Sequence, residues 1–231
     1  MLTNSDLVTE FAKNIMAKKD LKGKKVQDII RKIEITDKTI FADRCGTYFE
    51  IDAVADTDRA ETAVAKCILE YGYKMKKILF VGLGNAKYIS DALGEMVLDN
   101  LPPPSDKMAK FKPQVGRITG IESHDLIISA KKIVKPSIVI AIDSLATNDI
   151  AKVGKSIQIT NVGLTPGSGV GNSRKILTYK SLGLPIIAIG VPLVANINDG
   201  GNRRLVVPID IEDIAGKLAK TISNGIRQIL A

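Results

Sequence analysis

Two aspartates follow strongly apolar segments of this 231-residue chain, where carboxylates could do chemistry. Asp143 ends the run SIVIAID, and Asp91 is reached from the run KILFVG through the turn LGNAKYIS. In an open α/β sheet, ligands bind just beyond the carboxyl ends of the strands. If the two carboxylates meet there, their repulsion leaves one protonated and one ionised, so that one is an acid and the other a base that activates water. Such a pair is typical of a hydrolase.

Each aspartate also has a simpler interpretation. Asp91 opens a predicted helix, DALGEMVLDNL, and an acid in a first helical turn is stabilised by free N–H groups without any catalytic duty. A bare carboxylate after an apolar strand, as at Asp143, must be solvated, paired or used. Residue spacing alone therefore leaves a shared site open.

A glycine-dense loop, PGSGVGN over residues 166–172, is the second candidate for chemistry. The loop does not fit a P-loop, because the residue directly after Gly171 is Asn172 rather than lysine. The turn after KILFVG does not fit a dinucleotide fingerprint, because it lacks the third glycine. We interpret it as a tight loop in which Gly167, Ser168 and Gly169 bring exposed amides close to the aspartates or to a substrate backbone. Asn85 is expected to line the site from the other turn. A purely structural turn between two strands is the alternative reading of PGSGVGN.

The histidine and the two cysteines are weaker candidates for catalytic or metal-binding groups. His124 is the only histidine and has no partner at ligand spacing, so we expect a capping or surface residue rather than a general base. Cys45 and Cys67 lie in unrelated contexts without the spacing of a zinc site. The sequence therefore predicts no metal ligands and no cofactor, and the carboxylates remain the best chemical groups.

Hydrophobic spacing predicts the elements that position these residues. We expect an amphipathic helix over residues 5–18, an antiparallel ribbon over 29–54 and a long helix over 209–230. Between them, helices alternate with almost wholly apolar strands, as in a sheet covered on both faces. The predicted fold is an α/β three-layer sandwich with a mixed, mostly parallel sheet, phosphorylase/hydrolase-like, plus a small N-terminal β ribbon. The stretch LPPPSDKMAKFKP is too short to separate domains and is expected to be a surface loop, so residues 1–231 are expected to form one domain.

The net charge of +8 invites a nucleic-acid interpretation, but aromatic residues are few and the lysines are scattered through segments of both signs. We expect a solvated basic surface that favours acidic partners, with no direct nucleic-acid binding. The N-terminus has no apolar core of a signal peptide, and no apolar stretch approaches transmembrane length. A cytoplasmic protein without membrane contact is expected.

Several motifs together carry a family resemblance. In chain order, the segments VGLGN, SDALG, TGIES, IVIAIDSLA, SIQIT, GLTPGSGVGNSRK and LGLPIIAIGVPLV resemble the spore germination protease family, endopeptidases that degrade small acid-soluble spore proteins. The resemblance runs from about residue 76 to residue 195, and the C-terminal helix is similar as well. It implies that Asp91 and Asp143 are the two aspartates essential for peptide cleavage.

The resemblance has further implications. The family is made as a zymogen that removes its own leading segment, and its targets are cut after an acid in sequences of the type Thr-Glu-Phe-Ala. This chain contains TEFA, which predicts self-cleavage between Glu10 and Phe11 and a propeptide over residues 1–10. The implied setting is the cytoplasm of the forespore or spore core, and the implied assembly is a homo-oligomer, with a tetramer as the family suggests.

Departures from the family pattern keep two alternatives open. The residues AKYIS precede Asp91, whereas the family usually has a proline directly before this aspartate. The residues SLATND follow Asp143, where the family has a run that contains alanine and arginine. The short segment NDGGNRR replaces a longer insertion of the family. One alternative is a metal-dependent peptidase akin to the hydrogenase-maturation endopeptidases, with a divalent cation between the aspartates. The other is a paralogue that binds spore proteins without cutting them.

Overall fold

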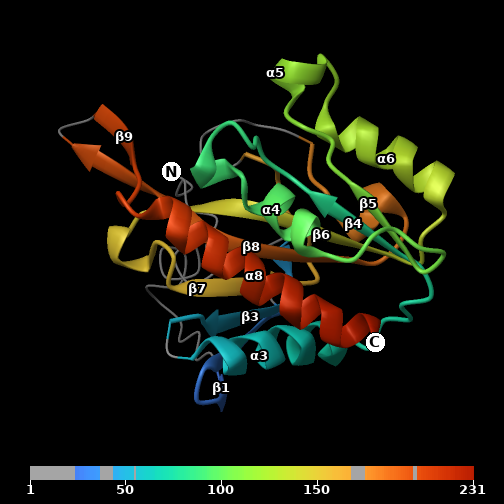
Figure 1. The fold of residues 1–231 in the computed structure, drawn as a ribbon, viewed down its shortest axis with the longest axis horizontal. Coiled ribbons are helices and arrows are strands. Elements are labelled where there is room, and N and C mark those ends of the chain that lie inside the picture. The colour runs from blue at the N-terminus through green and yellow to red at the C-terminus, as the bar shows by residue number, and fades with distance from the viewer. Residues whose placement is uncertain (1–23, 37–43, 55, 168–174, 200–201) are drawn as a thin grey trace.

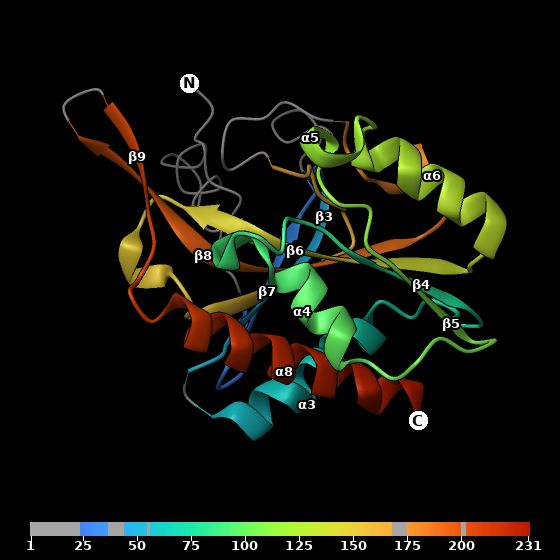
Figure 2. The ribbon, with the colours of Figure 1, turned by 45° about the horizontal axis from the view of Figure 1, so that its top comes forward.

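The central feature of the protein is one sheet of nine strands with helices on both faces (Figures 1 and 2). The computed structural model describes residues 24–36, 44–54, 56–167, 175–199 and 202–231. Within these ranges the strand order is β1-β2-β3-β7-β8-β6-β4-β5, and β9 pairs with β8. The predicted helix over 5–18, the TEFA segment and residues 37–43 of the predicted ribbon lie outside the described residues.

The sheet is mixed, as predicted, and its parallel part comprises four strands. These are β4 (Ile78–Gly82), β5 (Met108–Phe111), β6 (Ile138–Thr147) and β8 (Ile186–Asp199). The remaining strands pair antiparallel: β1 (Lys24–Gln27), β2 (Ile30–Ile35), β3 (Gly46–Asp52), β7 (Ser156–Thr160) and β9 (Asn202–Val206). The expectation of a mostly parallel sheet was wrong, because only the β4–β5, β4–β6 and β6–β8 pairings are parallel and the other five are antiparallel. The ribbon predicted over 29–54 contains β2 and β3, and it continues the main sheet through the β3–β7 pairing.

Helices form the two outer layers. Figure 2 shows α3, α4 and α8 on one face of the sheet, with α5 and α6 on the other. Their bounds are α3 (Thr57–Glu70), α4 (Leu93–Asn100), α5 (Gly116–Thr119), α6 (Ser123–Val134), α7 (Tyr179–Leu182) and α8 (Ile211–Leu230). The predicted three-layer α/β fold is confirmed. In the ranges that the structure covers, no helix has the length and apolar character needed to cross a membrane.

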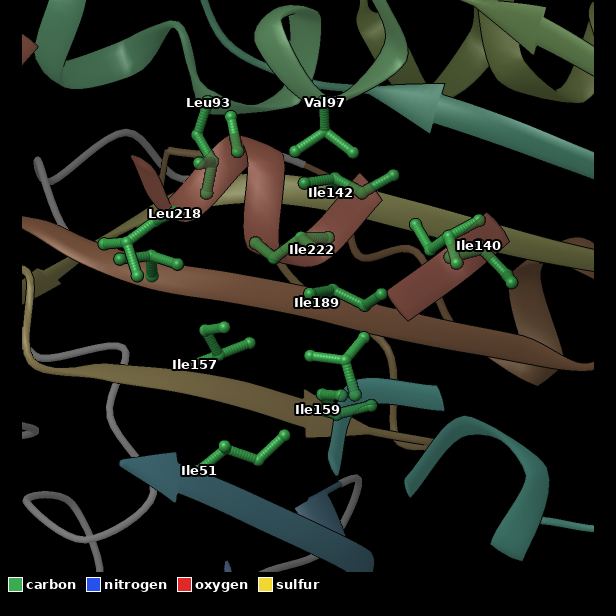
Figure 3. Packing of buried hydrophobic residues seen from close by; sticks show 14 of the residues in the cluster. Ile51, Leu93, Val97, Ile140, Ile142, Ile157, Ile159, Ile189, Leu218 and Ile222 are labelled. Atoms are coloured by element: carbon green, nitrogen blue, oxygen red, sulfur yellow. The ribbon is translucent and has the colours of Figure 1, made fainter. Parts of the chain in front are cut away.

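The alternation of side chains along β6 separates two cores. Ile138, Ile140 and Ile142 belong to the core under α3, α4 and α8, which we call the α8 face. Figure 3 shows Ile140 and Ile142 on the same side as Leu218 and Ile222 of α8. Val139 and Ala141 belong to the core under α6, the α6 face. The parity of a residue number in β6 therefore tells which face its side chain occupies, up to the irregularity after Leu145.

Two local predictions were wrong. The helix expected from Asp91 begins at Leu93, and Asp91 instead ends a short 3-10 helix, η2 (Ile89–Asp91). The stretch read as a surface loop contains β5, a four-residue edge strand paired only with β4 in the described chain. So short a strand carries almost no periodicity of its own, and its pairing with β4 is what makes it a strand.

Candidate functional site

The carboxyl ends of β4 and β6 bring the two predicted aspartates to one end of the sheet. β4 and β6 pair in parallel from Ile78 with Ile138 to Gly82 with Ile142. Directly beyond this ladder, the Leu83 N–H donates to the Ile142 carbonyl over 2.8 Å. Asp143 is thus opposite the turn that leads from β4 to Asp91.

Asp143 is a buried carboxylate on an otherwise apolar strand. Only 6% of the residue is exposed. By the alternation along β6, its side chain lies on the α6 face with Val139 and Ala141. Its Oδ1 atom accepts a hydrogen bond of 3.0 Å from the Ser144 N–H. The carboxylate is therefore oriented by the strand that carries it.

Asp91 is held against the turn after β4. Its carbonyl accepts a hydrogen bond of 2.9 Å from the Asn85 N–H. Gly84 has a φ of +101°, and a Cβ atom placed on it would lie 1.9 Å from the Asp91 carbonyl oxygen and 3.0 Å from Asp91 Oδ1. Only glycine allows this approach, so the second glycine of VGLGN is required by the position of Asp91.

Asn85, a predicted site residue, builds the turn itself. Its Oδ1 atom accepts from the Lys87 N–H over 3.0 Å, and its carbonyl accepts from the Tyr88 N–H over 2.9 Å. The side chain closes an Asx-turn of the kind that asparagine favours. In the structure Asn85 therefore shapes the loop that carries Asp91.

The two aspartates approach the end of β4 from opposite faces. Ile89 of η2 packs against the core of the α8 face, and residues of η2 lie within 8 Å of β6 and β8 between Cα atoms. A Cβ on Gly94, just after η2, would lie 2.4 Å from the Leu83 carbonyl oxygen and 2.7 Å from that of Ile142. The start of α4 thus rests on both strand ends. Asp91 reaches the site from the α8 face and Asp143 from the α6 face, with Leu83 and Gly84 between them.

The described residues that flank the glycine loop lie on the face of Asp143. Leu164 and Leu177 bond each other through both backbone groups, over 3.0 and 2.8 Å, and both pack in the core of the α6 face. Gly167 has a left-handed φ of +70°. The other two predicted loop residues, Ser168 and Gly169, lie outside the described part of the chain. The bridge between the leucines therefore lies on the α6 face, the face on which the Asp143 side chain lies.

A polar cluster at the start of α6 includes Lys175, the first described residue after the glycine loop. Lys175 Nζ lies 2.9 and 2.8 Å from the two carboxylate oxygens of Asp125, and His124 Nδ1 lies 3.0 Å from Asp125 Oδ1. The side chain of His124 is only 15% exposed. The sequence predicted a capping or surface role for His124, without a partner at ligand spacing. The cluster was missed because Lys175 is 50 residues from Asp125 and no local pattern links them.

Replacing Lys175 with methionine is expected to raise the pKa of Asp125. The hydrogen-bonded Lys175 ammonium, followed by the His124 contact, lowers the pKa of this carboxyl below its usual value. A lowered pKa in the folded state means that the contact stabilises the fold above the usual aspartate range and is lost as pH falls through the folded pKa. Carboxyl-carbon NMR titration of Asp125 in wild type and Lys175→Met measures this. The exposed Lys180→Met variant is the control, and an unchanged Asp125 titration in Lys175→Met would contradict the assignment.

A second buried polar side chain lies in the same cross-strand row as Asp143. Gln158 of β7 is opposite Gly190 of β8, which is opposite Asp143 of β6. Gln158 is 7% exposed. Opposed residues share a face of the sheet, so Gln158 and Asp143 flank a position without a side chain. The sequence motif SIQIT did not show this, because the row exists only once the strands pair.

Two further observations concern the cysteines and possible metal ligands. Burial raises the pKa of the Cys67 thiol to about 12, so this cysteine is protonated and unreactive at neutral pH. Across the described ranges there is no group of three histidine, cysteine, aspartate or glutamate residues that could hold a metal ion. The aspartates at the strand ends remain the candidate chemical groups.

Comparisons with known proteins agree on one family. Residues 105–200 match the family model described as germination protease. The germination protease of Priestia megaterium is 36% identical over 205 residues, which cover 76% of this chain and 55% of that protein. The germination protease of Oceanobacillus iheyensis is 34% identical over 225 residues, covering 83% of this chain and 61% of that protein. The chain thus spans little more than half the length of these relatives.

Solved structures are similar as well. One of them is a [NiFe] hydrogenase maturation protease, HycI, from Thermococcus kodakarensis KOD1, with a TM-score of 0.45 and 20% sequence identity. The match covers 66% of this chain and 93% of that one.

Proposed function

The chain belongs to the germination protease family, and we propose that it is an endopeptidase that hydrolyses small acid-soluble spore proteins with Asp91 and Asp143. The observation that supports this most directly is the placement of both aspartates at one end of the sheet, separated by Leu83 and Gly84. The proposal treats residues 1–231 as one peptidase domain.

In the proposed reaction, a water molecule lies between the two carboxyl groups. The ionised carboxylate takes a proton from this water while the water oxygen bonds to the peptide carbonyl carbon. The C–N bond then breaks, and the leaving nitrogen takes a proton from the protonated carboxyl. The amides of Gly167, Ser168 and Gly169 would stabilise the oxyanion between these steps.

The proposal extends to substrate and maturation. The substrate is an extended segment with a Thr-Glu-Phe-Ala type sequence, cut after the acid. The same reaction on TEFA of this chain, between Glu10 and Phe11, would remove residues 1–10. The proposed setting is the cytoplasm of the forespore or spore core, with the protein as a homo-oligomer, as a tetramer in the family's manner, and without a cofactor.

Peptide cleavage followed by mass spectrometry tests this function. After mildly acidic incubation, the full chain is expected to cut a TEFA-containing peptide after its glutamate and to lose ten residues from its own N-terminus. A TQFA peptide is expected to stay intact, and EDTA is expected to leave the rate unchanged. Loss of activity with EDTA would favour the metal-dependent alternative. Binding of the peptide without any cleavage would favour the non-catalytic paralogue.

A further inference from the structure

A buried hydroxyl lies next to Asp143 in the chain. The Oγ atom of Ser144 is shielded from solvent and has no hydrogen-bond partner among the described residues. A buried hydroxyl that bonds nothing is costly, and such groups in native proteins are usually satisfied by an ordered water or a ligand. Ser144 therefore indicates a bound group at this end of the sheet.

The backbone N–H of Ser144 bonds Asp143, whereas its side chain lies on the other face of the sheet. Its N–H donates to Asp143 Oδ1 over 3.0 Å. Ser144 pairs with Val191, which belongs to the core of the α8 face, and it has the same parity as Ile140 and Ile142. The hydroxyl consequently lies on the α8 face, from which η2 brings Asp91.

At Ser144, β6 pairs with a described strand on one side only, because β4 ends before this position. In the described chain, β4 pairs with β6 only as far as Ile142, whereas β8 continues to pair beyond it. Ser144 thus lies past the last β4 rung, in the region where Asp91 and Asp143 approach from opposite faces. Among the polar groups of the site, Ser144 is placed to reach a molecule held between them.

We propose that Ser144 Oγ binds the water that the two aspartates activate, an inference that rests on the proposed function. The water donates one hydrogen to the ionised carboxylate and the other to Ser144 Oγ, which leaves a lone pair on the water oxygen for the peptide carbonyl. Ser144 forms no covalent bond to substrate. The only histidine that could activate a serine nucleophile, His124, belongs to α6 on the opposite face.

Kinetics of Ser144→Ala tests the role in turnover. We expect kcat for a TEFA-type peptide to fall about 10- to 100-fold with KM nearly unchanged, because the water loses one of the bonds that orient it. Ser144→Thr keeps the hydroxyl and is expected to recover most of the activity. Ser137→Ala is the matched control, since it removes a hydroxyl bonded to the Lys77 carbonyl at the opposite end of the sheet and should leave kcat unchanged. A wild-type kcat in Ser144→Ala, or an equal loss in both alanine variants, would overturn the inference.

Crystal structures of wild type and Ser144→Ala give a readout independent of activity. An ordered water within hydrogen-bond distance of Ser144 Oγ and of an Asp91 or Asp143 carboxylate oxygen is expected in wild type and absent from the variant. An inactive wild type that holds this water would contradict the proposed function and support the water site. An active wild type without the water would leave the proposed function standing and overturn the role of Ser144.

Discussion

Replacing either Asp91 or Asp143 with asparagine is expected to lower kcat for a TEFA-type peptide by about 10²- to 10⁴-fold, the range for loss of a positioned acid or base. Asparagine has nearly the shape of aspartate but cannot exchange a proton. Asp143 is 6% exposed on a strand packed on both faces, so its amide should stay in place. The double variant should be little slower than the slower single one, because the two carboxyls act as a unit. Initial rates from chromatography of cleaved peptide measure this.

The control for these variants is Asp106→Asn. Asp106 is exposed in the loop before β5, at the opposite end of the parallel strands, and its replacement should leave the rate unchanged. Circular dichroism of each variant reports whether the fold is kept. Cleavage that persists in both single variants at the wild-type rate would show that the peptide bond is cut by other groups.

Replacing Gly84 with alanine is expected to destabilise the protein by roughly 3 kcal/mol or more and to abolish cleavage. The added Cβ would lie 1.9 Å from the Asp91 carbonyl oxygen, and the φ of +101° is one that alanine rarely adopts. Since the obstacle is backbone rather than a flexible side chain, the turn after β4 must move and carry Asp91 with it. Urea unfolding gives the free energy, and the peptide assay gives the activity.

Gly72→Ala separates backbone strain from the clash. Gly72 also has a positive φ, +66°, but a Cβ there meets nothing within 4 Å. This variant should lose only about 1–2 kcal/mol, the cost of the left-handed conformation for alanine, and should keep full activity. Equal losses of stability in the two variants would mean that the contact with Asp91 does not matter.

The elements that the sequence predicted well are those whose signal is local. The helix over 209–230 was predicted because its apolar residues repeat at helical spacing, and the structure has α8 over Ile211–Leu230. The strands β4, β6 and β8 were expected because their sequences are almost wholly apolar. β5 and β9 were missed, because strands of four and five residues on mixed sequences become strands only through a neighbour.

For the site, the sequence by itself determined that carboxylates follow apolar strands and which family the motifs resemble. These features are local, since each depends on a few consecutive residues. Only the tertiary structure decided that Asp91 and Asp143 approach from opposite faces of the sheet. It also decided that Lys175 holds Asp125 and that Ser144 turns its hydroxyl toward the α8 face. The physical reason is that strand order, register and face are properties of pairings between distant segments, and no single stretch of sequence contains them.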